Sequence, residues 1–180
     1  ILTNKNHKTG TDRVYEVINK SNYHDIDLVM NIQGDEPMLS IEDIKNLNNQ
    51  MIKTKSNLGT LASKISDKSF FDNENIVKVI TGHSLEQSNF PEALNFMRKT
   101  PKSEKNVYHH IGIYCYQIKI LKKFVSFSQS INEKKERLEQ LRALDNDIKI
   151  NVALAKRSSI GVDTEEDYLA IKKIMEYKSK

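Results

Sequence analysis

The sequence contains few of the residues that build disulfide frameworks or zinc sites. Its 180 residues include a single cysteine, Cys115, and 5 histidines that form no cluster with it. No disulfide can form within the chain, and the pattern of a structural zinc site is absent. Because Cys115 stands between tyrosines in a run of strand-forming residues, we interpret it as a small buried hydrophobic side chain.

Long hydrophobic runs are also lacking. The longest, residues 26–32 and 148–155, have the length of strands and are interrupted by polar residues. Neither is long enough to cross a bilayer, and no cleavable signal pattern is present. We therefore expect a soluble intracellular protein with no membrane partner.

The sequence also lacks a large excess of charge of either sign. The 28 lysines and arginines against 24 acidic residues leave a net charge of +4. The densest basic patches, Lys122–Lys123 and Lys134–Lys135, have no aromatic residues between them. Proteins that bind nucleic acids usually gather basic residues on one face. We therefore expect no nucleic-acid partner, and assign most lysines to solvated helix faces.

The sequence does contain an alternation of helical and strand patterns. A helix is expected after the turn at residues 9–12, with Thr11 as its N-cap. Further helical patterns cover residues 40–51, 134–144 and 164–177. Strand patterns cover residues 27–32, 58–65, 76–80, 107–117 and 148–155, whereas residues 81–106 are expected to be irregular. This alternation predicts an α/β domain over residues 1–180, with a mainly parallel sheet and an antiparallel strand excursion in the middle.

Two aspartates stand where an α/β sheet binds ligands. Asp35 directly follows the apolar strand 27–32, and Asp163 directly precedes the helix that Thr164 caps. Each alone is more simply interpreted as a turn or helix-cap residue. Because ligands bind at the carboxyl ends of parallel strands and Mg²⁺ prefers carboxylate oxygens, the two together predict a magnesium site for nucleotidyl transfer.

The strand pattern at 107–117 separates two faces. The two-residue period puts His110 and Tyr114 on one face and Ile111, Ile113 and Cys115 on the other. We expect the apolar face to lie on the core and the polar face to lie in a cleft.

Arg142 lies in the expected helix 134–144, three residues after Glu139. The two side chains can form a surface ion pair. Alternatively, the planar guanidinium of Arg142 is well suited to a substrate carboxylate. The sequence leaves both interpretations open.

Five motifs occur in a fixed order along the chain: HKTGTDR at 7–13, NIQGDEPM at 31–38, HIGIY at 110–114, LEQLR at 138–142 and GVDT at 161–164. Together they resemble the 3-deoxy-manno-octulosonate (Kdo) cytidylyltransferase family, and residues 75–79 match a further segment of it. The likeness runs from about Leu2 to Ile174. It implies a Rossmann-like nucleotidyltransferase fold and the reaction of CTP with Kdo to give CMP-Kdo and pyrophosphate, with Mg²⁺ as cofactor.

The resemblance also implies roles for individual residues. Asp35 and Asp163 fall where the family holds its catalytic metal. Residues implied to line the sugar pocket are Gln33, Arg98, His110, Tyr114, Glu139, Gln140 and Arg142. Residues implied to approach the nucleotide are His7, Gly10, Thr11, Asp12 and Arg13. The family further implies a cytoplasmic homodimer whose product enters lipopolysaccharide biosynthesis.

The sequence departs from the family pattern in several places. Thr9 replaces the usual serine, Cys115 replaces a glycine, and residues 99–106 lack an Ile-Pro-rich segment. The opening strand and the Arg/Lys/Gly-rich phosphate loop of the family have no counterpart. We therefore expect the fold to lack its first strand and phosphate loop, leaving one edge of strand 27–32 open and Val29 poorly covered. Residues 1–180 alone are then expected to be poorly soluble and inactive with CTP.

Two alternatives to Kdo activation remain at this point. One is CMP activation of a related acidic sugar, such as an amino-Kdo or a nonulosonate. The other is a catalytically incomplete sugar- or nucleotide-binding fragment. The Kdo hypothesis expects the carboxylates of Asp35 and Asp163 within about 8 Å of each other, since Mg²⁺–oxygen distances are about 2.1 Å. It also expects His110, Tyr114 and Arg142 in one cleft with Asp35.

Overall fold

The structure is a computed structural model that describes residues 1–20, 23, 25–101, 104–156, 161–162 and 164–178. The strands in this part of the chain are β1 (Leu28–Ile32), β2 (Leu58–Ser63), β3 (Lys78–Thr81), β4 (Ala93–Met97), β5 (Val107–Gln117) and β6 (Ile150–Leu154). The helices are α1 (Gly10–Lys20), α2 (Ile41–Thr54), the 3₁₀ helix η1 (Lys68–Phe71), α3 (Ile118–Ser126), α4 (Ile131–Glu136), α5 (Leu141–Leu144) and α6 (Glu165–Lys178).

The long strand β5 organises the sheet. It pairs antiparallel with β2 along one edge and with both β1 and β3 along the other, and β4 and β6 complete the order β4-β3-β5-β2-β6. The α/β class is confirmed, but the expected mainly parallel pairing is wrong. β2 and β6 form the parallel pair among the described strands. β1, β2, β3 and β6 all run in the same direction. Because β1, β2 and β3 each pair with β5, which runs the opposite way, these three pairings are antiparallel.

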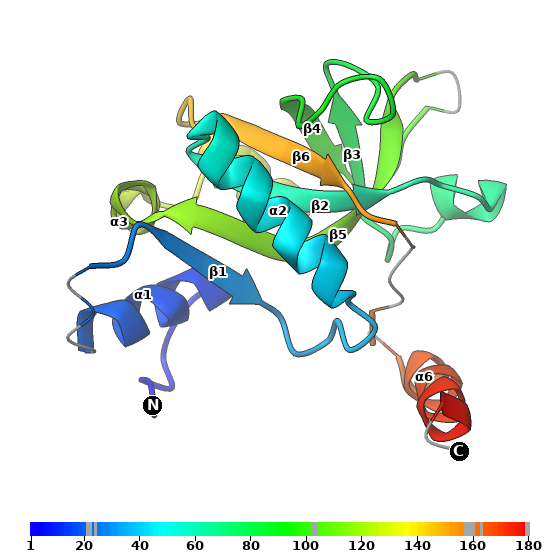
Figure 1. The fold of residues 1–180 in the computed structure, drawn as a ribbon, viewed down its shortest axis with the longest axis horizontal. Coiled ribbons are helices and arrows are strands. Elements are labelled where there is room, and N and C mark those ends of the chain that lie inside the picture. The colour runs from blue at the N-terminus through cyan, green and yellow to red at the C-terminus, as the bar shows by residue number, and fades with distance from the viewer. Residues whose placement is uncertain (21–22, 24, 102–103, 157–160, 163, 179–180) are drawn as a thin grey trace.

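Helices cover both faces of this sheet (Figure 1). On one face, Leu47 and Met51 of α2 pack with Ile113 and Cys115 of β5. On the other face, α1, α3 and α5 pack over the tyrosines of β5. Burial of these two apolar layers is the main stabilising contribution to the fold.

Glycine 59 allows α2 to lie close to the sheet. A Cβ atom on Gly59 would lie 2.7 Å from the Met51 sulfur and 2.8 Å from the Phe90 ring. Such distances are far inside van der Waals contact, so any larger residue at 59 would push α2 away from β2.

Strand β1 pairs with β5, and no described strand pairs with its other edge. This confirms the expected open edge. The expectation that Val29 is poorly covered is wrong, because Val29 is 7% exposed and belongs to the core cluster over which α1 packs. Ile32, at the end of the strand, is the exposed apolar residue at 51%.

Three local predictions need correction. Residues 81–106 contain β4, a short strand paired with β3. The expected helix 134–144 is divided into α4 and α5, because Arg137 adopts a left-handed conformation with φ of 55°. The first helix begins at Gly10, and its cap is the Thr9 hydroxyl, which accepts the Asp12 N–H at 3.3 Å, rather than Thr11.

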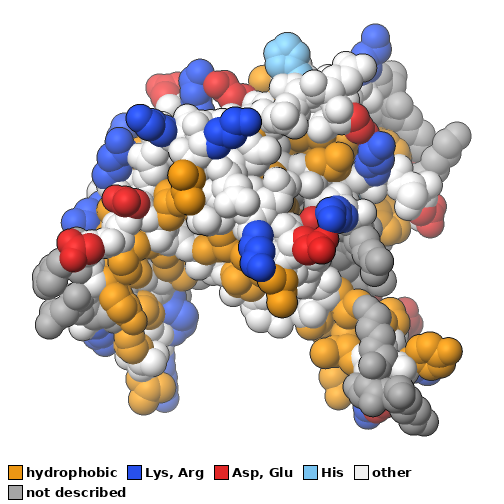
Figure 2. Space-filling view, in the orientation of Figure 1, with side chains coloured by type: hydrophobic (Ala, Val, Ile, Leu, Met, Phe, Trp, Pro, Cys, Tyr) orange, Lys and Arg blue, Asp and Glu red, His pale blue; other side chains and the backbone are white. Residues whose placement is uncertain are grey.

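The surface carries charges of both signs. On the face drawn in Figure 2, basic and acidic side chains are interspersed, and hydrophobic side chains gather near a notch between the lobes that hold α1 and α6. Within the described ranges, no helix has the length and apolar character needed to cross a membrane.

Candidate active site

The candidate site begins at a gap in strand pairing. Along one edge of β5, β1 pairs with residues 113–117 and β3 pairs with residues 107–109. The backbone N–H of Gly112 lies in the gap and donates a hydrogen bond of 3.2 Å to Glu36 Oε1. The loop after β1 therefore reaches over the gap and satisfies a sheet donor that no described strand partner reaches.

A pocket of about 480 Å³ opens at this gap. Its walls come from the loop after β1, the segment before β3, the end of β4, the middle of β5 and the start of the C-terminal segment. The lining residues are Gln33, Glu36, Phe70, Asn75, Ile76, Val77, Arg98, His109, His110, Gly112, Gly161 and Asp167. The pocket thus brings together three of the predicted sugar residues, Gln33, Arg98 and His110.

His110 is held tightly in the pocket wall. It is 7% exposed, its Nε2 lies 2.9 Å from the Thr60 hydroxyl, and its ring packs edge-on against Phe96. Burial, with a smaller contribution from His109, lowers the pKa of His110 to about 3. The imidazole is therefore neutral at neutral pH.

Arg98 is anchored by main-chain carbonyls. Its Nε donates to Glu136 O at 3.2 Å and its NH1 to Glu74 O at 2.9 Å. The fully buried Lys78 fixes the backbone here, because its Nζ donates to both Arg98 O and Asn73 O at 2.6 Å. Among the described residues, no hydrogen bond of Arg98 goes to a carboxylate, so its positive charge remains available to an anionic ligand.

Asp35 is exposed on the loop after β1, beside the segment that leads to Asp163. The N–H of Val162 donates to the carbonyl oxygen of Asp35 at 2.8 Å. Asp163 itself lies outside the described residues, so the predicted distance between its carboxylate and that of Asp35 stays a prediction. Where side chains are described, no group of three or more His, Cys, Asp or Glu is placed to hold a metal ion.

Arg142 and Tyr114 are not among the residues that line this pocket, and neither is Asp35, so the predicted single cleft with His110 and Asp35 stays a prediction. Arg142 is 2% exposed; its Nε donates to Glu133 Oε2 at 2.8 Å and its NH2 to Glu133 Oε1. Its guanidinium also lies over the Phe124 ring. The chain changes direction at Arg137, which has a left-handed conformation and separates α4 from α5. Arg142 therefore forms its ion pair with Glu133 of α4 and not with Glu139.

The predicted sugar residues Glu139 and Gln140 are not among the residues that line the pocket, and Glu139 lies near Tyr114 and Tyr116 of β5. Burial raises the pKa of Glu139, and hydrogen bonds from the Thr11 and Thr9 hydroxyls oppose the shift. Glu139 Oε1 is enclosed without a hydrogen-bond partner. Gln140 is 7% exposed. Glu139 therefore meets the predicted nucleotide segment at the start of α1.

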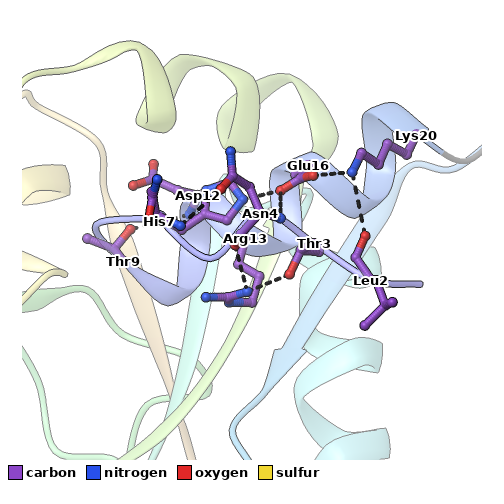
Figure 3. A network of polar contacts seen from close by, with 10 residues as sticks. Leu2, Thr3, Asn4, His7, Thr9, Asp12, Arg13, Glu16 and Lys20 are labelled. Atoms are coloured by element: carbon purple, nitrogen blue, oxygen red, sulfur yellow. Dashed lines mark hydrogen bonds and ion pairs between the residues drawn. The ribbon is translucent and has the colours of Figure 1, made fainter.

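Two of the predicted nucleotide residues, His7 and Arg13, belong to a network of polar contacts around α1 (Figure 3). His7 contacts the Glu16 carboxylate, and Arg13 donates to the Thr3 hydroxyl and to Asn4 O. Lys20, followed by His7, lowers the pKa of Glu16 to about 2. These contacts fold the N-terminal segment back onto the helix.

The remaining nucleotide candidates stand at the helix start. Gly10 lies beside Asn31 of β1, because a Cβ atom there would be 4.0 Å from Asn31 Nδ2. Thr11 is 1% exposed and its hydroxyl lies 3.3 Å from the Tyr116 hydroxyl. Asp12 follows in the first turn of α1.

The sequence analysis missed Glu36, which lines the pocket, and two residues that support its wall, Thr60 and Lys78. Glu36 lies beside Asp35 in the same motif, and this adjacency was a usable signal. Thr60 and Lys78 carried no signal, because their contacts with His110 and Arg98 depend on how distant strands are aligned.

Comparisons with known proteins show the family of the chain. A family described as cytidylyltransferase matches residues 1–150. A 3-deoxy-manno-octulosonate cytidylyltransferase of Thermodesulfovibrio yellowstonii is 41% identical over 177 residues, with 93% of this chain and 69% of the relative covered. The Photorhabdus laumondii protein of the same name is 39% identical over 180 residues, with coverage of 96% and 72%.

Solved structures give the same result. A CMP:2-keto-3-deoxy-manno-octonic acid synthetase complexed with CTP aligns with a TM-score of 0.85 at 30% identity, over 99% of this chain and 72% of that one. An apo UDP-glucose pyrophosphorylase aligns with a TM-score of 0.70 at 12% identity, over 98% and 63%, which shows the fold alone. The Rossmann-like nucleotidyltransferase fold is thereby confirmed.

Proposed function

Because the chain belongs to the 3-deoxy-manno-octulosonate cytidylyltransferase family, we propose that it transfers the cytidylyl group of CTP to Kdo. A sugar hydroxyl attacks the α-phosphorus of CTP and loses its proton. A new phosphorus–oxygen bond forms, the bond to the β-phosphate oxygen breaks, and pyrophosphate leaves. The observation that carries this proposal is the pocket beside β1, which combines the fixed cation of Arg98 with hydrogen-bonding side chains such as Gln33 and His110.

Arg98 is the residue that we assign to the sugar carboxylate. Its guanidinium is fixed by carbonyl oxygens, whereas Arg142 is occupied by the buried Glu133 carboxylate. Binding a substrate anion at Arg142 would require breaking that ion pair, which costs several kcal/mol. Arg98 requires no such exchange.

For the cofactor, we assign Mg²⁺ to Asp35 and Asp163. The hydrogen bond from Val162 to Asp35 O, which holds the two loops together, supports this assignment. Such a site suits Mg²⁺, which takes one or two protein carboxylates and completes its shell with water and phosphate. When bound, the ion would supply electrostatic stabilisation of the charge that builds on the transferred phosphate.

The start of α1 is assigned to the nucleotide. A helix N-terminus offers free N–H groups and positive potential to phosphates. Glu139 reaches the same place beside Thr9 and Thr11. We also propose, from the family resemblance, that residues 1–180 form one nucleotidyltransferase domain and that the protein acts as a cytoplasmic homodimer in lipopolysaccharide biosynthesis.

Pyrophosphate release tests this function directly. In a chain that carries the family's opening strand and phosphate loop ahead of residue 1, we expect release with CTP plus Kdo and little with CTP plus other acidic sugars or with other nucleotides. Arg98→Ala is expected to raise KM for the sugar about tenfold or more, with KM for CTP unchanged, since 1.4 kcal/mol corresponds to a tenfold change. Lys99→Ala is the matched control, because Lys99 pairs with Glu74 on the surface. Equal effects of both variants would contradict the assignment of Arg98.

A further inference from the structure

An irregularity in strand pairing places one hydroxyl group beside His110. The register of β2 on β5 shifts by two residues, because Thr60 pairs with Tyr114 and Leu61 pairs with Ile111. Bulges of this kind are common next to active sites, where they re-aim side chains. The Thr60 hydroxyl, which is fully buried, lies in the bulge at 2.7 Å from Ile113 O and 2.9 Å from His110 Nε2.

These two distances determine where the protons lie. A hydroxyl has one hydrogen to donate. Two oxygens 2.7 Å apart without a hydrogen between them would repel each other, so the Thr60 hydrogen must point at Ile113 O. The Thr60 oxygen is then an acceptor, and His110 Nε2 must carry the hydrogen that it receives.

The other ring nitrogen is left as a lone-pair acceptor. A neutral imidazole with its hydrogen on Nε2 has none on Nδ1. In the described part of the chain, His110 Nδ1 has no hydrogen-bond partner and is not among the enclosed polar atoms. His110 lines the pocket, so Nδ1 is the ring atom left to meet a ligand.

We propose that Thr60 is a positioning residue that fixes His110 as the Nε2–H tautomer, so that Nδ1 accepts a hydrogen bond from a sugar hydroxyl. The proposal rests on the proposed function, since that function supplies the sugar. A lone-pair acceptor recognises an O–H group and repels a carboxylate or phosphate oxygen. His110 and Arg98 thus bind different groups of an acidic sugar: His110 binds a hydroxyl and Arg98 binds the carboxylate.

Nitrogen NMR of protein with ¹⁵N-labelled histidine tests the proposal without any substrate. His110→Asn identifies the His110 signals. We expect the wild-type ring to be protonated at Nε2 and unprotonated at Nδ1, and Thr60→Ser to keep this pattern. Thr60→Val, which has the same shape without the hydroxyl, should give a mixture of tautomers. Finding the proton on Nδ1 in the wild type would overturn the proposal, whether or not Thr60→Val folds.

Kinetics supply the second readout. Thr60→Val is expected to raise KM for the sugar at least tenfold with little change in KM for CTP, and Thr60→Ser to restore it. Thr81→Val is the matched control, because the buried Thr81 hydroxyl also donates to a carbonyl, His83 O at 2.7 Å, away from the pocket. A change in sugar KM as large for Thr81→Val as for Thr60→Val would contradict the proposal. If Kdo is not turned over even by a chain that carries the family's phosphate loop, the proposed function fails while the NMR result still decides the tautomer.

Discussion

The Glu36 carboxylate accepts the backbone N–H of Gly112 at 3.2 Å. A side chain thus takes the place of a strand in the gap between β1 and β3. The contact joins the loop that carries Asp35 to the floor of the pocket, so the metal and sugar assignments depend on the same segment.

Gly112→Ala is expected to weaken sugar binding. The new Cβ atom would lie in van der Waals contact with Gln33 Oε1, at 3.4 Å, and with Glu36 Oε1, at 3.7 Å, so an apolar methyl group would occupy the space between two polar side chains of the pocket. We expect KM for the sugar to rise about tenfold, or about 1.4 kcal/mol. In Gly82→Ala, the control, the Cβ atom would lie 3.7 Å from Leu94 in a strand-edge turn and should leave KM unchanged. Identical sugar KM values for Gly112→Ala and wild type would contradict the pocket assignment.

Arg142 and Glu133 are expected to act mainly on stability. Removing either partner leaves a buried charge uncompensated, which costs about 3–5 kcal/mol. Arg142→Met and Glu133→Gln should therefore lower the free energy of unfolding by similar amounts in urea titrations. Glu42→Gln, which breaks the exposed pair with Lys156, should cost less than about 1 kcal/mol. If Arg142→Met instead lowers the affinity for the sugar without lowering stability, Arg142 binds the substrate and this interpretation is contradicted.

His110 is expected to make stability depend on pH. Its pKa is lowered to about 3 in the fold, below the ordinary value of 6.5. Between these values the unfolded chain binds more protons, so stability falls as the pH drops from 6.5 toward 3. The slope from one such group is at most about 1.4 kcal/mol per pH unit. The pKa of His109 is also lowered, to about 4, so His110→Gln should reduce the slope without abolishing it. Unfolding titrations from pH 4.5 to 7.5 measure how the free energy of unfolding depends on pH. The same slope in His110→Gln as in the wild type would show that the buried His110 ring does not cause this dependence.

Asp35→Asn is expected to raise the Mg²⁺ concentration needed for half-maximal activity and to lower the maximal rate. An amide keeps the size of the side chain but loses the charge that holds the ion. Asp27→Asn is the matched control, because Asp27 is exposed at the opposite end of the same strand. If both variants show the wild-type Mg²⁺ titration, Asp35 is not a metal ligand.

The sequence predicted correctly which side chains share each face of β5. The prediction holds in spite of the bulge opposite Thr60, because that bulge adds two residues to β5. An even insertion keeps the alternation of side chains, so His110 and Tyr114 stay on one face and Ile113 on the other. The loop after β1 could be located as well, since a largely apolar strand ends there in a segment with a glycine and a proline. These are local signals.

The errors came from contacts that are distant in sequence. The direction in which β5 enters the sheet determines which pairings are antiparallel, and no residue of β5 encodes it alone. The left-handed residue Arg137 interrupts a helical pattern whose apolar spacing continues unbroken, and it decides that Arg142 meets Glu133. The helix α3 was missed, and its apolar residues Leu121 and Phe124 are recognisable mainly through the core that they join.

A structure of the protein with Kdo bound tests the central claim most directly. The account predicts the sugar in the pocket between β1 and β3, over Gly112, with its carboxylate against Arg98 and a hydroxyl against His110 Nδ1. Arg142 is predicted to remain bonded to Glu133. A sugar carboxylate bound by Arg142, with the Glu133 pair broken and Arg98 untouched, would contradict the account.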